Sequence, residues 1–328
     1  MLNGVKQGGV LSPVLFCVYI DDLLHTIARS KEGCYIGQMF VGVLAYADDI
    51  VLLAPTASAM RQMLRLCEEF AEKFSVLFNP SKSKCIVCES SSKRKLGTSS
   101  QDVAFTLGGS VIDVVDNWLH LGHIVSSDLD DTADISRSHN KLVTQINSVL
   151  CTFSSLDAIV KVKLLKSYCL SLYGCELWNL SHTDIGKICK SWRFGLRRVW
   201  SLPSGCRSTI LQLLSDSIPL YDLICQRSVM FIKRCLCSES AVVQYVANYG
   251  MMHGHMKSLI GRNLVTSSEH FNISVYNLVN AGFNGKSVKS LFVRQVLPDF
   301  YSRTLSILEL LMIRRGLLYV GTTGVHTR

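Results

Sequence analysis

The sequence lacks several features that would place it in a special class of protein. No apolar run reaches about 18 residues before a proline or a charge interrupts it, so no membrane-spanning helix is predicted. The first residues, MLNGVKQGGV, lack the basic stretch and uninterrupted apolar core of a secretory leader. Internal repeats are also missing. The 328 residues that remain are enough to bury a large core and to divide into two or three units.

Acidic residues are scarce relative to basic ones. Asp and Glu number 25 against 34 Lys and Arg, which gives a formal net charge of +9. Such an excess is common in proteins that bind a polyanion such as nucleic acid or an acidic membrane surface. Many enzymes that bind neither are equally basic, so the charge indicates a partner class without selecting it.

Most of the 13 cysteines are not spaced as the ligands of a zinc site are. Cys85 and Cys88 form a CxxC pair, and Cys235, Cys237, His253 and His255 form CxC and HxH pairs, but neither group has a close second pair at finger spacing. Without a secretory leader, the thiols are expected to be reduced and mostly to fill core positions. A zinc site stays open as the alternative.

Residue spacing predicts helices and strands in alternation, followed by helices. Ser12 and Pro13 look like the cap and first residue of a helix of roughly 16 residues, and Thr56 can cap a second helix that ends near Phe74. Between them, residues 39–54 predict a tight hairpin, and residues 84–89 predict a strand before a polar loop. From about Ala133 helical patterns dominate, with interruptions at 201–206 and 281–286. The apolar positions that define the two helices are Leu15, Phe16, Tyr19, Ile20, Leu23, Leu24 and Ile27, then Met60, Met63, Leu64, Cys67, Phe70, Ala71 and Phe74.

Two adjacent carboxylates, Asp48 and Asp49, interrupt the predicted hairpin in the stretch AYADDIVLLA. A desolvated charge costs several kcal/mol unless it is paired, solvated or bound to a cation. Carboxylate oxygens suit Mg²⁺ or Mn²⁺, and two such ions stabilise the attacking and leaving oxygens of phosphoryl transfer. The alternative is a solvent-exposed turn, because Asp is common in turns.

Four segments in order resemble the palm of the reverse transcriptases of non-LTR (LINE-like) retrotransposons: GVKQGGVLSPVLF, AYADDIVLLA, LFNPSKSKCIV and NWLHLGHIV. Farther on, YGCELWNL and LRRVWSLP are similar to the helical thumb region of the same elements. The resemblance implies an α+β fold with a partial palm over residues 1–125, a helical thumb over 126–200 and a helical C-terminal region over 201–328. It also implies RNA-directed DNA synthesis from dNTPs with Mg²⁺ (or Mn²⁺), an RNA template and a DNA primer as partners, and a nuclear or cytoplasmic location.

The resemblance assigns roles around the carboxylate pair. Asp48 would be the direct metal ligand, and Asp49 its neighbour with a less direct contact. Tyr46 and Ala47 would shape the floor under the primer terminus.

Other residues would meet the substrates. The resemblance places Gln7 and Gly8 near the incoming nucleotide and template, where glycine allows close backbone approach. Lys82 would stand near the triphosphate as a cation or general acid, or else be an ordinary surface lysine, and Lys84 suits the role less. The LG turn resembles a primer grip, although His120 stands where the family usually has Tyr.

Two further charged groups have structural alternatives. Asp21 and Asp22 also form a pair, but on the predicted helix they are expected to be structural. In WRFGLRRVW, Arg193, Arg197 and Arg198 would either grip a nucleic-acid backbone or lie in water above a helix whose aromatic residues pack inward.

One departure from the family affects the expected activity. Its complete members carry another catalytic Asp on a strand before the QGxxLSP helix, preceded by a fingers subdomain, whereas only six residues precede Gln7. The sequence is therefore expected to be an N-terminally truncated member with little or no polymerase activity alone, unless a second polypeptide supplies the missing strand. The alternatives are a nucleic-acid-binding remnant without catalysis and a non-functional retroelement fragment that aggregates through exposed apolar sheet edges.

Overall fold

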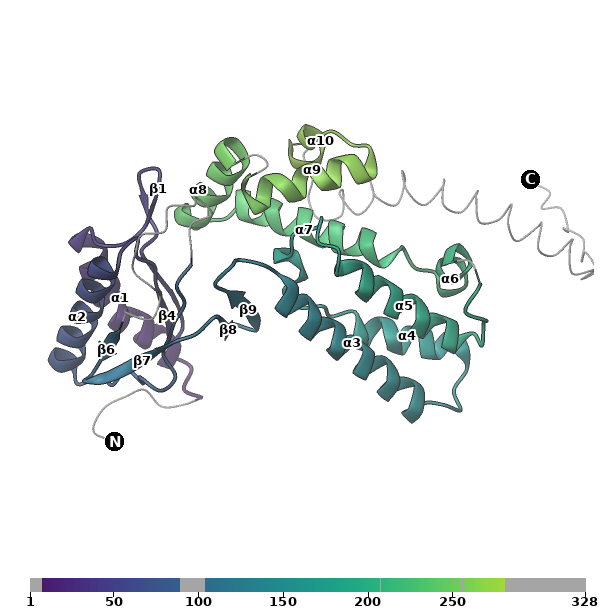
Figure 1. The fold of residues 1–328 in the computed structure, drawn as a ribbon, viewed down its shortest axis with the longest axis horizontal. Helices are drawn as coiled ribbons and strands as arrows, with labels where there is room; N and C mark the ends of the chain where they lie inside the picture. Colours follow the sequence, from purple (N-terminus) through teal and green to yellow (C-terminus); the bar gives the residue numbers. More distant parts are fainter. Residues whose placement is uncertain (1–7, 89–103, 207, 255–256, 281–328) are drawn as a thin grey trace, which may run out of the picture. The chain divides into compact units, whose positions relative to one another are not determined.

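The computed structural model describes residues 8–88, 104–206, 208–254 and 257–280, and Figure 1 shows their fold. The chain divides into two compact units. The first consists of Met1–Asp131 and Cys235–Gly254, and the second of Thr132–Arg234 and the chain from His255 onward. None of the helices in the described ranges is both long and apolar enough to cross a membrane.

The first unit combines helices with short strands, as the sequence predicts for its α+β region. In the described residues, β1–β2, β3–β4 and β8–β9 are two-stranded antiparallel hairpins, and a small sheet has the order β5-β7-β6, in which β6 is antiparallel and β5 parallel to β7. The elements are α1 (Ser12–Ser30), β1 (Tyr35–Ile36), β2 (Met39–Phe40), β3 (Val43–Tyr46), β4 (Asp49–Leu52), α2 (Ala57–Phe74), β5 (Lys84–Cys85), β6 (Phe105–Leu107), β7 (Ser110–Val114), β8 (Asn117–His120), β9 (His123–Ser126), α8 (Ala241–Tyr249) and the π-helical turn η3 (Gly250–Gly254).

The core of this unit lies between α1, α2 and the sheet. Leu23 and Met63 are fully buried, together with residues of β6 and β7 such as Phe105 and Ile112. Helix α2 begins where the sequence predicts, because the Thr56 hydroxyl oxygen accepts a hydrogen bond from the Ala59 N–H at 3.2 Å. The predicted helical spacing of α2 is thereby confirmed, with Cys67 and Phe70 buried.

Helix α1 departs from its prediction at both ends. It starts at Ser12 with Leu11 as the N-cap residue, so Ser12 is not the cap, and it runs on to Ser30. Ile20 is the first buried residue of α1, whereas Phe16 is half-buried against the core and Leu15 and Tyr19 are 56% and 39% exposed. Helical spacing identified an apolar helix but overestimated the part of it that the core covers.

The strands also differ in detail from the predicted ones. Met39 and Phe40 pair with β1 and not with the Asp48–Asp49 hairpin, because Gly42 separates β2 from β3. The strand predicted over 84–89 is confirmed only at Lys84–Cys85. Strands β6 to β9 have three to five residues each, too few for a period-2 pattern to be distinguished in the sequence.

The second unit is helical in its described parts, as predicted from Ala133 onward. The predicted interruption at 201–206 falls between α5 and α6, whereas that at 281–286 lies outside the described residues. Its elements are α3 (Thr132–Thr152), α4 (Ala158–Cys169), the 3₁₀ turn η2 (Cys175–Leu177), α5 (Ile185–Val199), α6 (Ser208–Ser215), α7 (Leu220–Leu236, whose last two residues belong to the first unit), α9 (Leu259–Phe271) and α10 (Val275–Asn280).

Buried polar side chains fix the loop around η2 in the core of the second unit. Asp134 is 0% exposed, and its carboxylate accepts hydrogen bonds from the Trp178 indole N–H and the Arg137 guanidinium, each at 2.8 Å. Asn263 accepts the Leu180 N–H at 3.0 Å and donates to the Trp178 carbonyl at 2.8 Å. These bonds satisfy groups that would otherwise lose the solvation of water without compensation.

Candidate functional site

The two aspartates that interrupt the apolar run lie at the tip of a tight hairpin. Strands β3 and β4 pair from Val43↔Leu52 to Tyr46↔Asp49, which leaves Ala47 and Asp48 as a two-residue turn. Ala47 has a φ of 53°, and this positive value at the first turn position is typical of a type II′ turn. The predicted location of the pair near a hairpin turn is therefore confirmed.

The pair is exposed to solvent, as the alternative of a solvent-exposed turn predicts. Asp48 and Asp49 are exposed, and Tyr46 beside them is 69% exposed. Val43, Ile50 and Leu52 pack against the core of the unit, but the tip of the hairpin projects beyond it. Water solvates both carboxylates there, so no desolvation cost has to be offset by a cation.

The turn places a non-glycine residue in a backbone region that favours glycine. We expect Ala47→Gly to raise the free energy of unfolding of the first unit by up to about 1 kcal/mol. A positive φ costs alanine roughly 1–2 kcal/mol, and glycine avoids this cost. The larger conformational entropy of glycine in the unfolded chain offsets roughly 0.5–1 kcal/mol of the difference. Urea denaturation followed by circular dichroism would measure the change. Ala45→Gly, in the ordinary strand beside it, is the matched control and should destabilise. Equal losses in both variants would contradict a strained turn.

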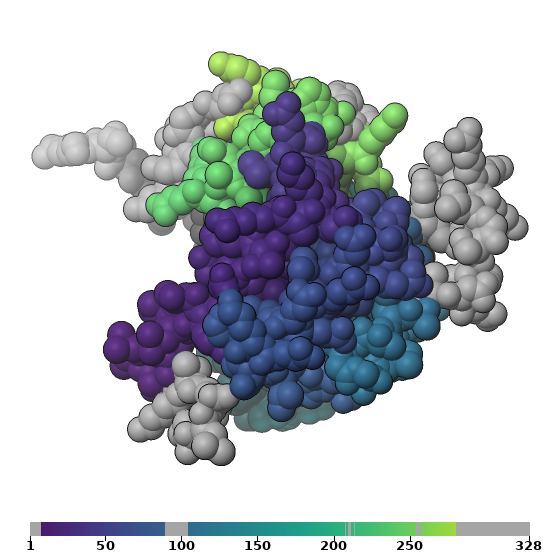
Figure 2. Space-filling model, turned by 90° about the vertical axis from the view of Figure 1, so that its left-hand side faces the viewer, coloured from purple at the N-terminus to yellow at the C-terminus, as the bar shows by residue number. Residues whose placement is uncertain are grey.

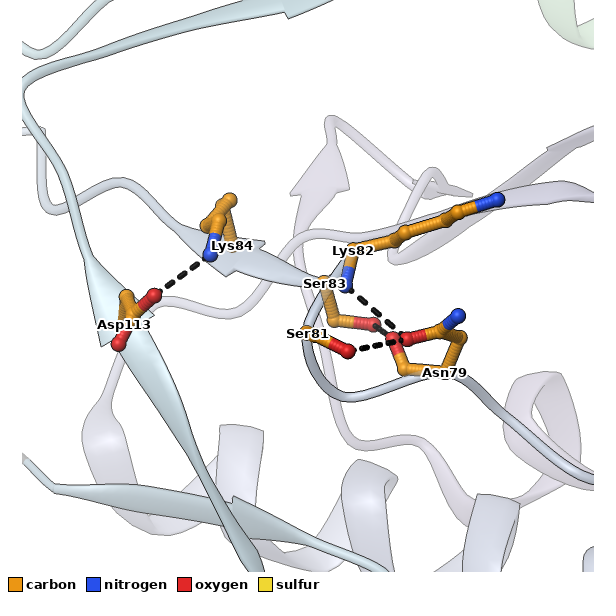
Figure 3. A network of polar contacts seen from close by, with 6 residues as sticks. All are labelled: Asn79, Ser81, Lys82, Ser83, Lys84 and Asp113. Carbon is orange, nitrogen blue, oxygen red and sulfur yellow. Dashed lines mark hydrogen bonds and ion pairs between the residues drawn. The ribbon is translucent and has the colours of Figure 1, made fainter.

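The segment NPSKSK forms a turn organised by Asn79 (Figure 3). The Asn79 side-chain oxygen accepts the Ser81 hydroxyl at 2.8 Å and the Lys82 N–H at 3.2 Å, and its carbonyl accepts the Ser83 hydroxyl at 2.9 Å. Lys82 is exposed, and its amine points away from the other residues drawn. The turn leaves the Lys82 amine exposed to solvent. This position agrees both with a cation that binds an anionic ligand and with an ordinary surface lysine.

Lys84, two residues on, is engaged within the fold. Its amine lies 2.5 Å from the Asp113 carboxylate on β7 and 5.7 Å from the centre of the Trp118 ring on β8, and its side chain is only 13% exposed. The partners explain why Lys84 suits the triphosphate role less than Lys82. They also connect β5 to the following hairpin, which the sequence alone did not indicate.

The LG segment forms the turn of the β8–β9 hairpin. His120 pairs with His123, and Leu121 and Gly122 between them have φ values of 45° and 81°. Positive φ at both positions is typical of a type I′ turn, the kind that matches the twist of a two-stranded hairpin. Trp118, Leu119 and Leu121 expose 38%, 52% and 42% of their surfaces, so this hairpin presents apolar side chains to a ligand or to water.

Gln7 and Gly8, at the start of the chain, are the residues expected near the incoming nucleotide and template. Gln7 lies outside the described residues. Gly8 has a φ of 80°, and a Cβ there would meet no atom within 4 Å. Its positive φ strains any side chain, while the open space around it leaves the backbone accessible.

Asp21 and Asp22 are surface residues of α1, as expected. Asp21 lies 3.4 Å from the His25 ring and Asp22 lies 3.8 Å from the Lys73 amine, and all four side chains are more than half exposed. Exposed pairs of this kind contribute little to stability.

The arginines of α5 are largely used within the fold. Arg197 donates to the Cys206 carbonyl at 2.8 Å, and Arg198 donates to the Asn147 side-chain oxygen at 2.5 Å. Trp192 is buried, while Phe194 is 57% exposed beneath the Arg198 guanidinium at 6.0 Å. Arg193 is half-buried, and the exposed cations of α5 are Lys187, Lys190 and Arg198, so both interpretations of this helix retain support.

Five of the thirteen cysteines are buried, four are half-buried and four are exposed, so the expectation that most of them fill core positions is wrong. Burial raises the pKa of Cys67, Cys175 and Cys225 to about 12, and that of Cys169 and Cys189 to about 11. Zinc binds thiolates, which these raised pKa values disfavour at neutral pH.

A divalent cation fits the aspartate pair as part of a ligand set. In the described ranges, no group of three or more His, Cys, Asp or Glu side chains is arranged to hold a metal. Mg²⁺, however, typically takes one or two carboxylates together with waters and substrate phosphates. Two adjacent exposed carboxylates at a hairpin tip can supply the protein's share of such a set.

Comparison with known proteins relates the first unit to one family. Residues 1–125 match the family model described as reverse transcriptase (RNA-dependent DNA polymerase). The Pol polyprotein of the type-2 retrotransposable element R2DM of Drosophila melanogaster is 33% identical over 123 residues, which are 37% of this chain and 11% of that protein. The corresponding type-1 R2 protein of Nasonia vitripennis is 31% identical over 128 residues, or 38% and 12%. The RNA-directed DNA polymerase of the mobile element jockey of Drosophila funebris is 25% identical over 201 residues, or 56% and 20%. The chain thus spans 11% to 20% of the length of these relatives.

Proposed function

Because residues 1–125 match the reverse transcriptase family model and resemble proteins of non-LTR retrotransposons, we propose that they form part of the palm of an RNA-directed DNA polymerase. The supporting observation is the β3–β4 hairpin, which presents Asp48 and Asp49 on its exposed tip within the matched segment. Residues 126–200 would be the thumb and residues 201–328 a further helical region. The polymer partners would be an RNA template and a DNA primer, in the nucleus or cytoplasm.

The residues would divide the work by their chemistry. Asp48, with Asp49 beside it, would hold Mg²⁺ or Mn²⁺, which when bound neutralises phosphate charge and activates the primer 3′-OH. Tyr46, directly opposite Asp49 on the adjacent strand, would contact the primer terminus from the same face of the hairpin. Lys82 would meet the triphosphate, and Gly8 would let template backbone approach closely.

The first test uses Mn²⁺ alone as the probe. We expect the full chain to bind Mn²⁺, detected by isothermal titration, and Asp48→Asn to weaken that binding at least about tenfold, since a neutral amide is a poorer ligand for a hard cation than a carboxylate. Asp21→Asn, on an exposed pair of the same unit, is the matched control and should bind as the wild type does. Equal affinities in the wild type and Asp48→Asn would contradict the assignment.

Activity gives the second measurement. We expect little or no dNTP incorporation on an RNA template by the chain alone, because a two-metal site needs more carboxylates than the pair on this hairpin. Template-dependent incorporation that disappears in Asp48→Asn would show that the chain by itself suffices.

A nucleic-acid-binding role without catalysis is the second candidate. The formal charge of +9 and the exposed Lys190, Phe194 and Arg198 of α5 favour it. Binding to an RNA–DNA primer–template that weakens steeply with salt and is unchanged in Asp48→Asn would support this role over the catalytic one.

A further inference from the structure

A helix distant in sequence reaches the turn of the β1–β2 hairpin. Gly37 and Gln38 form that turn, and the Gln38 N–H donates to the Tyr245 hydroxyl of α8 at 3.5 Å. Gly37 has a φ of 59°, and a Cβ there would overlap the Tyr245 hydroxyl oxygen and lie 3.4 Å from the Tyr249 ring. Figures 1 and 2 both show α8, in green, against the purple N-terminal hairpin of the same unit.

Stacked rings hold Tyr245 in place. Tyr249 lies one turn farther along α8 with its ring centre 6.2 Å from that of Tyr245 and nearly parallel to it. His253 in η3 follows with its ring 4.8 Å from Tyr249. The three side chains form a column along one face of the helix, so the tyrosine at the hairpin has little rotamer freedom.

The other end of the β1–β2 hairpin is joined to the aspartate hairpin. The Cys34 N–H donates to the Leu53 carbonyl at 2.9 Å, and the Leu53 N–H donates to the Gly42 carbonyl at 2.7 Å. Gly33 and Gly42 approach so closely that a Cβ on Gly42 would lie 3.0 Å from the Gly33 Cα and 2.5 Å from the Phe40 ring. Leu53 directly follows β4 and Gly42 directly precedes β3, so the junction holds both strands that carry Asp48 and Asp49.

We propose that Tyr245 is a positioning residue for Asp48 and Asp49, acting through the Gly37 turn, the β1–β2 hairpin and Leu53. This inference rests on the proposed function, because it gives the carboxylates a ligand to bind. The α8 contact fixes the turn of the β1–β2 hairpin. The hydrogen bonds around Gly42 and Leu53 join the opposite end of the β1–β2 hairpin to the base of the aspartate hairpin. An isolated two-stranded hairpin is marginally stable, so external contacts at both ends decide its orientation.

The experiment separates this contact from backbone strain. Gly37→Ala should push the Tyr245 hydroxyl away, accelerate hydrogen exchange at the Cys34 and Leu53 amides, and weaken Mn²⁺ binding roughly threefold to tenfold. Adding Tyr245→Phe removes the overlapping oxygen but keeps the ring, whose Cζ would lie 3.6 Å from the new Cβ, so the double variant retains a contact with the turn and should recover most of the affinity and protection. Gly108→Ala is the matched control, because Gly108 has a φ of 57° in the same unit but a Cβ there meets no atom within 4 Å.

Each outcome decides the proposal. Loss in Gly37→Ala with recovery in the double variant and none in Gly108→Ala supports it. Wild-type Mn²⁺ affinity in Gly37→Ala, or a double variant no better than the single one, overturns it. If the wild type binds no Mn²⁺, the proposed function fails, and exchange at Leu53 then decides alone whether Tyr245 controls the hairpin.

Discussion

Asp134→Ala is expected to lower the free energy of unfolding of the second unit by about 3–5 kcal/mol. The Asp134 carboxylate is 0% exposed and accepts hydrogen bonds from the Trp178 indole and from Arg137. Removal leaves a buried indole N–H and a partly buried guanidinium without this acceptor, and the full desolvation cost of such groups then counts against the folded state. Trp178 is itself 0% exposed, so water cannot readily replace the carboxylate.

Urea denaturation followed by circular dichroism would measure this loss. Asp134→Asn retains an oxygen that can accept the Trp178 hydrogen bond and should cost clearly less than Asp134→Ala. Asp21→Ala, on the surface of α1, should change stability by less than about 0.5 kcal/mol. A loss below about 1 kcal/mol in Asp134→Ala would mean that the network contributes little to the fold.

Gly195→Val should lower the free energy of unfolding by about 1–3 kcal/mol through overpacking. Helices α3 and α5 approach closely at this position, where a Cβ on Gly195 would lie 3.0 Å from Cγ2 and 3.1 Å from Cδ1 of Ile146. A β-branched side chain adds atoms beyond that Cβ, so either the helices separate or Ile146 leaves its rotamer. The near neighbours Ile146 and Leu196 are buried in the same core, which leaves no room for a local adjustment.

Gly186 on the same helix is the matched control. It is exposed, and a Cβ there would meet no atom within 4 Å. Gly186→Ala should therefore raise the free energy of unfolding by about 0.4–1 kcal/mol, because it restricts the unfolded chain. Thermal denaturation of both variants gives the comparison, and a destabilised Gly186→Ala would show that α5 does not tolerate side chains at either glycine.

Local signals in the sequence predicted the elements whose causes are local. The Thr56 cap and the spacing from Met60 to Phe74 lie within one segment, and α2 forms there as predicted. The aspartate turn was predicted because two apolar runs flank it, and the paired strands confirm it. The resemblance to non-LTR reverse transcriptases, read from four short segments, is confirmed for residues 1–125.

Features that depend on distant contacts were not predictable in this way. The apolar context of Asp48 and Asp49 left open whether the pair is desolvated or lies in an exposed turn, because exposure depends on how far the hairpin extends past the core, which no local pattern contains. The spacing of α1 likewise could not show that Leu15 and Tyr19, on the apolar face of its first half, remain exposed. The Tyr245 contact joins positions 207 residues apart, and a tyrosine in an apolar helix gives no sign of a glycine turn as its partner.

The discontinuous make-up of the first unit has a consequence for how the chain is made. Synthesis proceeds from the N-terminus at roughly 5–20 residues per second, so the segment Cys235–Gly254 leaves the ribosome on the order of ten seconds after Asp131. During that interval the β1–β2 turn has no α8 to cover it. The order of emergence thus leaves the aspartate hairpin, although it is made early, without its complete surroundings until α8 has been synthesised.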